Sequence, residues 1–283
     1  VWGVSSLITA KPDKDASSTI SNVSSEPEVP HKIASATVVN TGDLLIHSPV
    51  LNGAKQTDGS YDFSQIYSYA DTLYSQYDYM VANLEVTLGG DEYEYSGYPL
   101  FNTPDNIVDC LKNSGVDILL TANNHSYDTS AHGFWRTQQV IAEKGLDYTG
   151  TRTENNKNYL VKDINGIKVG MVNYTYETGA SEGRKALNGI LMSTETQDYI
   201  NSFDYNDLDG FYAEMQTDID NMYKDGAEVI MAYIHWGDEY VLSANDYQKA
   251  MAQKLCDMGV DVIVGGHPHV VEPIEILSSD VSG

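Results

Sequence analysis

The sequence contains little cysteine: only Cys110 and Cys256 occur among its 283 residues. Two cysteines are too few for a disulfide scaffold, and they exclude a zinc site built from cysteine. Each lies in a stretch with a helical pattern, so we expect two small, buried apolar side chains. A disulfide bridge between them is the alternative.

Positive charge is also scarce. Sixteen Lys and Arg residues stand against 41 Asp and Glu residues, which gives a formal net charge of −25 at pH 7. Nucleic-acid backbones and anionic lipids are bound by clustered cations, so we expect no nucleic-acid partner and no peripheral docking on anionic membranes. The 41% of hydrophobic residues allow a sizeable core and exclude disorder along the whole length.

Long hydrophobic runs are absent too, because no 18 consecutive residues form an apolar membrane span. The first ten residues, VWGVSSLITA, are mildly apolar, and a charged, serine-rich stretch follows over residues 11–30. We interpret residues 1–33 as a linker after a removed signal or anchor segment, which predicts an extracytoplasmic, membrane-anchored protein. The alternative is a boundary within a cytosolic protein.

Beyond this linker, short β-branched runs alternate with segments whose apolar residues recur at helical spacing. The expected helices cover residues 63–76, 105–115, 131–145, 208–226 and 245–259. The expected strands cover residues 36–43, 77–85, 116–125, 146–150, 159–163, 167–174, 227–237 and 260–269. The alternation predicts one α/β domain over residues 34–283.

Two other patterns have open interpretations. Residues 109–125 resemble residues 254–269, either because any helix–Gly–strand unit looks alike or because the domain has two pseudo-symmetric halves. Residues 180–207 lack a clear period and are long for a loop, so they are either functional or an excursion over the site. The segment DYNDLDG at 204–210 lacks the acceptor spacing of a calcium loop, and we interpret it as a solvated turn and helix cap.

Acidic, amide and histidine side chains gather at the ends of five predicted strands. They are Asp43 with His47 four residues later, Glu85, Asn124 with His125, His235, and His267 with His269. One such histidine would most simply be structural, but five strand ends of this kind are hard to assign to packing. Ligands bind at the carboxyl ends of strands in open α/β sheets, and imidazole and carboxylate groups bind Zn, Fe, Mn or Ni. We therefore predict a two-metal site, with the ions about 3.5–4 Å apart.

The GGHPH segment at residues 265–269 supports this interpretation. Gly265 and Gly266 allow the backbone to pass close to the site. Because Pro268 biases His267 toward an extended conformation, we expect the turn to spread His267 and His269 across two ions.

Together these motifs resemble a known superfamily. Gly42-Asp43, NLE at 83–85, NNH at 123–125, HWG at 235–237 and GGHPHV at 265–270 are similar to the calcineurin-like metallophosphoesterases. Within that superfamily, NLE, HWGDEY and GGHPHV resemble the poly-γ-glutamate capsule biosynthesis (CapA/PgsA) family over about residues 35–277. The resemblance implies an α/β fold of the four-layer α/β/β/α sandwich type, with ligands on loops at one edge of two packed sheets.

The resemblance also implies metal ligands. The expected sets are Asp43 and His269 for one ion, and Asn124, His235 and His267 for the other. Glu85 stands where the superfamily usually has a bridging Asp, and the longer side chain could change the intermetal distance or the choice of metal. His47 matches inexactly, because the superfamily has Asp-x-His there, and it is expected as a ligand or as a neighbour of the ligands.

The remaining expected roles concern proton transfer and substrate. His125 matches the histidine that donates a proton to the leaving group, and Asp128 would orient it, with a cap of the following helix as the alternative. Glu239 is expected to contact substrate, with a solvated turn as its alternative.

The function implied by the resemblance is biosynthesis or export of poly-γ-glutamate outside the cytoplasm. The resemblance also implies a hydrolase of the phosphoesterase type with two divalent ions (Mn, Zn or Fe). Expected partners are an anionic polymer or phosphoester substrate and other membrane components of a polymer synthesis complex. Alternatives are a two-metal phosphoesterase for an unrelated substrate and a non-catalytic binding module. Family members usually continue beyond GGHPHV with another strand, so we expect a truncated C-terminus or a removed C-terminal anchor.

Overall fold

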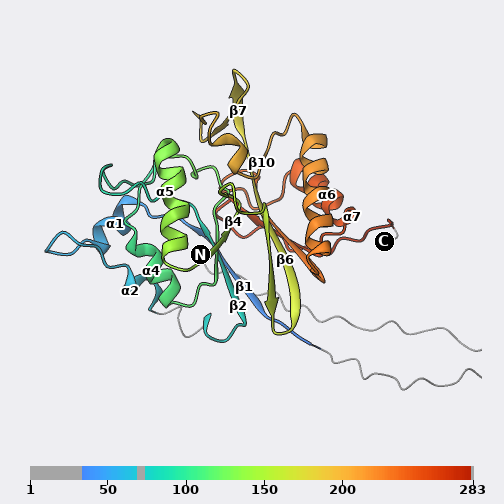
Figure 1. The fold of residues 1–283 in the computed structure, drawn as a ribbon, viewed down its shortest axis with the longest axis horizontal. Helices are drawn as coiled ribbons and strands as arrows, with labels where there is room; N and C mark the ends of the chain where they lie inside the picture. The colour runs from blue at the N-terminus through green and yellow to red at the C-terminus, as the bar shows by residue number, and fades with distance from the viewer. Residues whose placement is uncertain (1–33, 69–73, 282–283) are drawn as a thin grey trace, which may run out of the picture.

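Two sheets with parallel strands occupy the middle of the molecule in Figure 1, a computed structural model that describes residues 34–68 and 74–281. The first sheet is all parallel, in the order β1 (Val38–Leu44), β2 (Tyr79–Leu84), β3 (Ile118–Leu120) and β4 (Asp147–Thr149). The second has the parallel order β10 (Ser202–Phe203), β6 (Ile167–Tyr176), β11 (Val229–His235) and β12 (Val262–Gly266), with β5 (Tyr159–Ile164) antiparallel to β6. The predicted α/β class is thus confirmed.

The helices lie on the two outer sides of this pair of sheets (Figure 1). Beside the first sheet are α1 (Ser48–Ala54), α2 (Ser64–Tyr67), α4 (Asn106–Asn113) and α5 (Ser130–Glu143). Beside the second are α6 (Leu208–Lys224) and α7 (Asp246–Asp257). A small antiparallel sheet of β7 (Thr178–Ser181), β8 (Arg184–Leu187) and β9 (Ile190–Leu191), followed by a 3-10 turn (Gln197–Tyr199), projects away from both.

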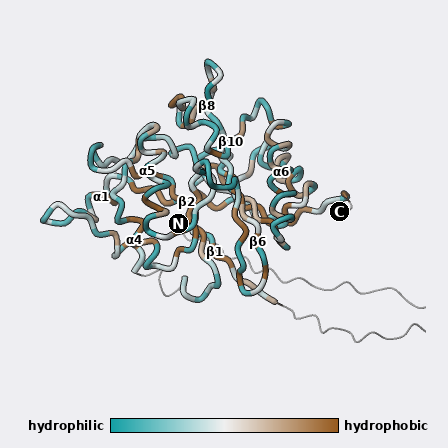
Figure 2. The backbone as a smooth tube through the Cα atoms, viewed as in Figure 1, coloured by the Kyte–Doolittle hydropathy of each residue, from teal (hydrophilic) through white to brown (hydrophobic). Residues whose placement is uncertain are grey.

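Alternating side chains of the central strands explain where the core forms. In β2, Met80 and Ala82 pack in the cluster that contains the helices α1, α4 and α5, whereas Val81 packs in a cluster shared with the second sheet. In β11, Ile230 joins the cluster formed with α6 and α7, and Met231 joins Val81. A strand buried on both faces has a continuous run of apolar residues in the sequence. This is why the positions of the central strands, coloured as hydrophobic in Figure 2, could be predicted.

Of the helix expected over residues 63–76, α2 covers Ser64–Tyr67, Tyr74 is also helical, and residues 69–73 lie outside the described part. The structure corrects two other predicted details. The strand expected over 116–125 ends at Leu120, and the polar residues after it form turns. Cys110 on α4 and Cys256 on α7 are half-buried rather than buried as expected, and no disulfide joins them. The predicted linker, residues 1–33, also lies outside the described residues.

The likeness between residues 109–125 and 254–269 comes from a connection that recurs elsewhere. Four helices end at a glycine of positive φ, and the next residue donates its backbone N–H to a carbonyl five residues earlier. These bonds are Val116 to Leu111, Leu146 to Ile141, Ala227 to Met222, and Val260 to Leu255, at 3.0, 3.2, 2.9 and 3.0 Å. The recurrence favours a common helix-to-strand unit over a special symmetry of two segments.

The unassigned region 180–207 has a defined structure of its own, which contains β8, β9 and β10. After it, Asp207 caps α6 by accepting a hydrogen bond of 3.1 Å from the backbone N–H of Gly210. The interpretation of DYNDLDG as a turn and helix cap is therefore confirmed. Within residues 34–68 and 74–281, none of the helices combines the length and apolar character of a membrane span.

Asp218 generates a prediction about stability. It is buried on α6, where burial raises its pKa from 3.8 to about 6, against the hydrogen bond of 2.8 Å that it accepts from Tyr174 Oη. A raised carboxyl pKa means that the folded state keeps a proton that the unfolded chain has lost, so stability declines as the pH rises from about 4 to about 6.

We expect Asp218→Asn to remove this decline and to stabilise the fold above pH 6 by roughly 2 kcal/mol, since about two pKa units correspond to 2–3 kcal/mol. Urea unfolding between about pH 4 and pH 7, with chelator present throughout, measures the difference from wild type. The matched control is Asp220→Asn, which changes an exposed carboxylate on the same helix. Parallel pH curves for Asp218→Asn and wild type would contradict the argument.

Candidate metal centre

The carboxyl ends of strands from both sheets converge on one site. Asp43 of β1 lies opposite Asn83 of β2, and His235 of β11 lies opposite Gly266 of β12. Parallel pairing brings these ends to the same edge of each sheet, which places polar side chains from distant parts of the chain together. The predicted strand-end cluster is therefore present in the structure.

Asp43 is held by donors on both of its oxygens. Its Oδ1 accepts from Asn83 Nδ2 at 2.7 Å, and its Oδ2 accepts from the backbone N–H of His267 at 2.9 Å and contacts His269 Nδ1 at 3.0 Å. Burial raises the pKa of Asp43, but the hydrogen bonds, that from His269 foremost, hold the pKa well below its ordinary value. Asp43 is therefore a carboxylate at neutral pH.

Glu85 has the opposite environment. Its side chain is fully buried just after β2, and burial together with the charge of Asp43 raises its pKa well above the ordinary value. Asn83 Nδ2 reaches Glu85 Oε2 at 3.3 Å, whereas Oε1 has no hydrogen-bond partner among the described residues. A buried, unpartnered carboxylate oxygen is costly without a compensating charge.

The histidines at the site supply neutral ring nitrogens. Burial lowers the pKa of both His235 and His267 to about 4, so both rings are uncharged at neutral pH. His235 Nε2 lies 2.8 Å from Asn124 Oδ1 and 3.4 Å from Glu85 Oε1. His267 Nδ1 has no hydrogen-bond partner among the described residues, which leaves a second buried ligand atom unused. Neutral imidazole is the form that binds metals.

These side chains form overlapping groups whose ligand atoms all lie within 4.8 Å of one another. The groups are Glu85, His235 and His267; Asp43, Glu85 and His269; and Glu239, His267 and His269. The donor chemistry and the unpartnered atoms of Glu85 and His267 both fit a divalent cation. Glu85 belongs to two groups, the position that a bridging carboxylate would occupy.

The side chains of His125 and Asp128 form a buried pair beside these groups. His125 Nδ1 lies 2.7 Å from Asp128 Oδ2, which also accepts from the backbone N–H of Phe101 at 2.7 Å. The ring of His125 contacts the ring of Phe101 edge-on, with the ring centroids 4.7 Å apart. The predicted orienting contact between the carboxylate and the imidazole is thus present.

Two predicted residues lie at the margin. His47 is exposed at the start of α1, in none of the three ligand groups, and its ring contacts Phe101 with centroids 5.1 Å apart. Its role as a ligand stays a prediction. Glu239 is exposed, but one of its carboxylate oxygens lies within 4.8 Å of a ring nitrogen of His267 and of His269. It is therefore placed to bind a cation as well as a substrate.

Sequence reasoning missed several residues that shape the site. Asn83 connects Asp43 to Glu85, and Asn123 Nδ2 in turn donates to Asn83 Oδ1 at 3.0 Å. Asn83 and Glu85 are two residues apart at the end of β2, and residues at this spacing in a strand share a face. This spacing could have identified Asn83 as a residue of the site. Tyr176 Oη lies 3.3 Å from His267 Nε2, and no local sequence pattern predicts this contact.

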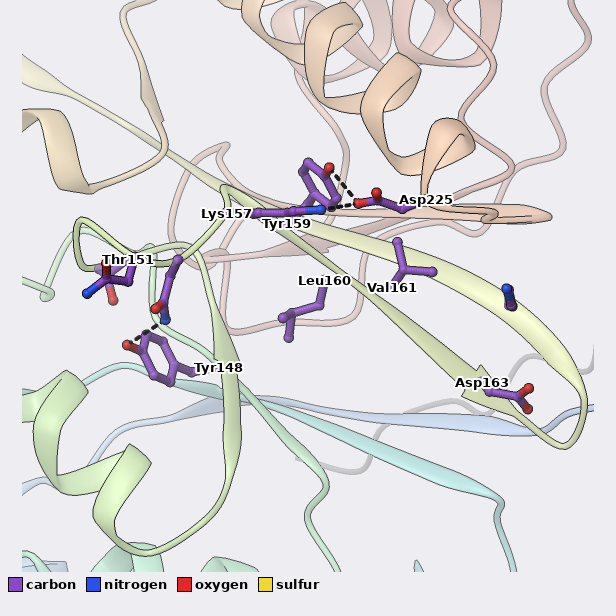
Figure 3. Close-up of a pocket in the computed structure, with 11 residues that line it drawn as sticks. Tyr148, Thr151, Lys157, Tyr159, Leu160, Val161, Asp163 and Asp225 are labelled. Carbon is purple, nitrogen blue, oxygen red and sulfur yellow. Dashed lines mark hydrogen bonds and ion pairs between the residues drawn. The ribbon is translucent and has the colours of Figure 1, made fainter.

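A separate hollow of about 660 Å³ lies away from these side chains, along β4 and β5 (Figure 3). Tyr148, Lys157, Tyr159 and Asp225 line it, and Asp225 pairs with Lys157 and accepts from Tyr159 Oη at 2.8 Å. None of the candidate ligands contributes to its lining. Lys157 and Asp225 already pair with each other, so the strand-end cluster, with its unpartnered ligand atoms, is the better candidate for chemistry.

Gly266 gives a prediction about this cluster. A Cβ atom there would lie 3.1 Å from Asp43 Oδ1 and 3.3 Å from His235 Nδ1, tighter than ordinary contacts. We expect Gly266→Ala to displace both side chains and to weaken metal binding by on the order of tenfold, as disturbed supporting contacts do. Isothermal titration with Mn²⁺ or Zn²⁺ measures this.

The control is Gly179→Ala, because a Cβ atom at position 179 meets nothing within 4 Å. This variant should bind metal as wild type does. Equal affinities for Gly266→Ala and Gly179→Ala would show that the close approach of Gly266 has no bearing on the site.

The chain is similar in sequence to known capsule synthesis proteins. The sequence profile of a family described as bacterial capsule synthesis protein PGA_cap matches residues 37–281. The chain is 26% identical to the PGA biosynthesis protein CapA of Bacillus subtilis (strain 168) over 221 residues, which cover 76% of this chain and 54% of that protein. It is 23% identical to the capsule biosynthesis protein CapA of Bacillus anthracis over 253 residues, which cover 87% of this chain and 57% of that protein. The chain spans little more than half the length of these relatives.

Proposed function

The chain belongs to the bacterial capsule synthesis protein PGA_cap family, and on this premise we propose that it acts in the biosynthesis or export of a poly-γ-glutamate capsule polymer. The observation that carries a chemical role is Glu85, a fully buried carboxylate shared by two ligand groups, with one oxygen unpartnered among the described residues. A bound cation would stabilise the ionised form of this side chain, whose pKa burial and the charge of Asp43 otherwise raise. We propose a two-metal site of the metallophosphoesterase type.

The proposed fold is the four-layer α/β/β/α sandwich of that superfamily, formed by a single domain over residues 34–283. Three apolar clusters support it. One joins the first sheet to α1, α4 and α5, one joins the two sheets, and one joins the second sheet to α6 and α7. Each sheet would then be buried on both faces, as sheets with parallel strands require.

The proposed ligands divide between the two ions by their positions. Asp43 and His269 would hold one, and Asn124, His235 and His267 would hold the other. Glu85 would contact both, since it is within ligand distance of His235 and of His269. Bound cations of this kind polarise phosphoryl oxygens and lower the pKa of water, which is the chemistry that Mn, Zn or Fe would supply.

Side chains of the protein would protonate the leaving group. His125 would give a proton to the leaving oxygen, and Asp128 would hold the imidazole through the 2.7 Å contact at Nδ1. Both side chains are largely buried, with 4% of His125 and 6% of Asp128 exposed. Glu239, exposed near His267 and His269, would meet the substrate or a cation at the entrance.

The proposed substrate is an anionic polymer or a phosphoester on the path to it. The net charge of −25 opposes a polyanion, so binding would depend on the positive charge held at the ligand cluster. We place the protein outside the cytoplasm, membrane-anchored and associated with other membrane components of polymer synthesis. The family match favours this role over an unrelated phosphoesterase or a non-catalytic module.

Removal of metal tests the centre. Asp43, Glu85 and three histidines crowd one site, so cations that bind only the folded form should raise the melting temperature. We expect a melting temperature at least about 5 °C higher with excess Mn²⁺ or Zn²⁺ than with EDTA, measured by calorimetry. Glu85→Gln should largely abolish the difference, and coincident wild-type melting curves would exclude the centre.

Neighbouring residues with different proposed roles give a second test. Asn124→Ala should lower the occupancy of one ion, because it removes a ligand oxygen. His125→Ala should keep both ions and slow hydrolysis of aryl phosphates with poor leaving groups by on the order of 10²-fold, the usual contribution of a general acid. Elemental analysis and phosphatase assays check both variants. Loss of an ion from His125→Ala would overturn the assignment.

A further inference from the structure

The β8–β9 hairpin turns at Asn188 and Gly189. Leu187 pairs with Ile190 across the turn, and the two turn residues have φ values of 48° and 73°. A two-residue hairpin turn with both φ values positive is of type I′, for which Asn-Gly is the preferred sequence. The backbone conformation of the turn therefore explains why Asn and Gly occur at positions 188 and 189. It does not require the Asn188 side chain to contact any particular group.

The Asn188 side chain nevertheless reaches the proposed proton donor. Its Nδ2 donates to Pro99 O at 3.2 Å and to Asp128 Oδ1 at 3.2 Å, and it lies 3.3 Å from His125 Nδ1. An amide NH₂ has two hydrogens, so the two oxygen acceptors match them. Asp128 Oδ2 already accepts from Phe101 and contacts His125, and Asn188 supplies a donor to the other oxygen.

The hairpin is anchored firmly enough to hold this contact. Leu187 and Met192 are fully buried in a cluster with Tyr127, which lies between His125 and Asp128, and with Phe134 of α5. Tyr127 Oη also accepts a hydrogen bond of 3.0 Å from the backbone N–H of Ser193. Because both elements share this cluster, Asn188 keeps its place relative to the His–Asp pair.

We propose that Asn188 is a positioning residue for His125. By donating to Asp128 Oδ1 it fixes the carboxylate whose Oδ2 accepts a hydrogen bond from Nδ1–H of His125. This leaves Nε2 as the nitrogen that gives a proton to the leaving oxygen. The proton that Nε2 gives to the leaving oxygen is regained from water. This role rests on the proposed function of the site, and it assigns the region 180–207 a part in the chemistry.

Three variants separate the amide from the turn. Asn188→Gly keeps the turn, since glycine adopts positive φ readily, and removes the donor. Asn188→Asp keeps the size and tolerates positive φ, but it presents an acceptor to Asp128. The control is Glu182→Gly, an exposed residue with a φ of 57° in the β7–β8 turn of the same small sheet.

The first readout is the dependence on the leaving group. With Mn²⁺ bound, both Asn188 variants should lose on the order of tenfold in kcat for phenyl phosphate, with KM changed less than about twofold. The loss for p-nitrophenyl phosphate should be clearly smaller, because a good leaving group needs less protonation. Glu182→Gly should match wild type. Equal losses on both substrates would refute a role through His125.

The second readout does not require activity. In ¹⁵N-histidine spectra, the His125 signals, identified by their loss in His125→Ala, should show a proton on Nδ1 in wild type and Glu182→Gly, and a mixture of tautomers in Asn188→Gly. A wild-type chain that hydrolyses neither phosphate would contradict the proposed function, while these spectra would still decide the role of Asn188. Unchanged His125 signals in both Asn188 variants would overturn the proposal.

Discussion

Two buried carboxylates at the ends of neighbouring strands are the constraint on which the site depends. Asp43 and Glu85 repel each other in a region that excludes water, and charges in such a region must be compensated locally. Protein donors satisfy Asp43, whereas Glu85 retains an unpartnered oxygen among the described residues. The neutral rings of His235 and His267 add ligand atoms without adding compensating charge. A divalent cation bound here, as we propose, would supply that charge.

The carboxyl-end cluster could be predicted from sequence because it rests on two local signals. Buried strands appear as continuous apolar runs, and the polar residue that follows each run marks its end. Parallel pairing then brings these ends together, so Asp43, Glu85, Asn124, His235, His267 and His269 were found without knowledge of tertiary contacts. The α/β class followed from the same alternation.

Other features depend on tertiary contacts that sequence alone does not specify. His47 follows Asp43 closely in sequence, but the chain turns into α1 directly after it, and its ring meets Phe101 rather than the ligand groups. Asn188 reaches Asp128 across 60 residues of chain, so only its turn chemistry was visible locally. The strand expected over residues 116–125 had the correct apolar run, yet that run alone could not show that the strand would end at Leu120.

The loop after β12 has a strained backbone at both of its histidines. His267 and His269 have φ values of 92° and 55°, so the extended conformation predicted for His267 from Pro268 is wrong. In this region side chains with a Cβ are strained by about 1 kcal/mol or more each. Glycine at either position would relieve that strain but would remove an imidazole. Selection for stability and selection for the site therefore oppose each other at these positions. Substitutions that restore stability to this domain are to be sought elsewhere in the chain, where conformation and chemistry do not compete.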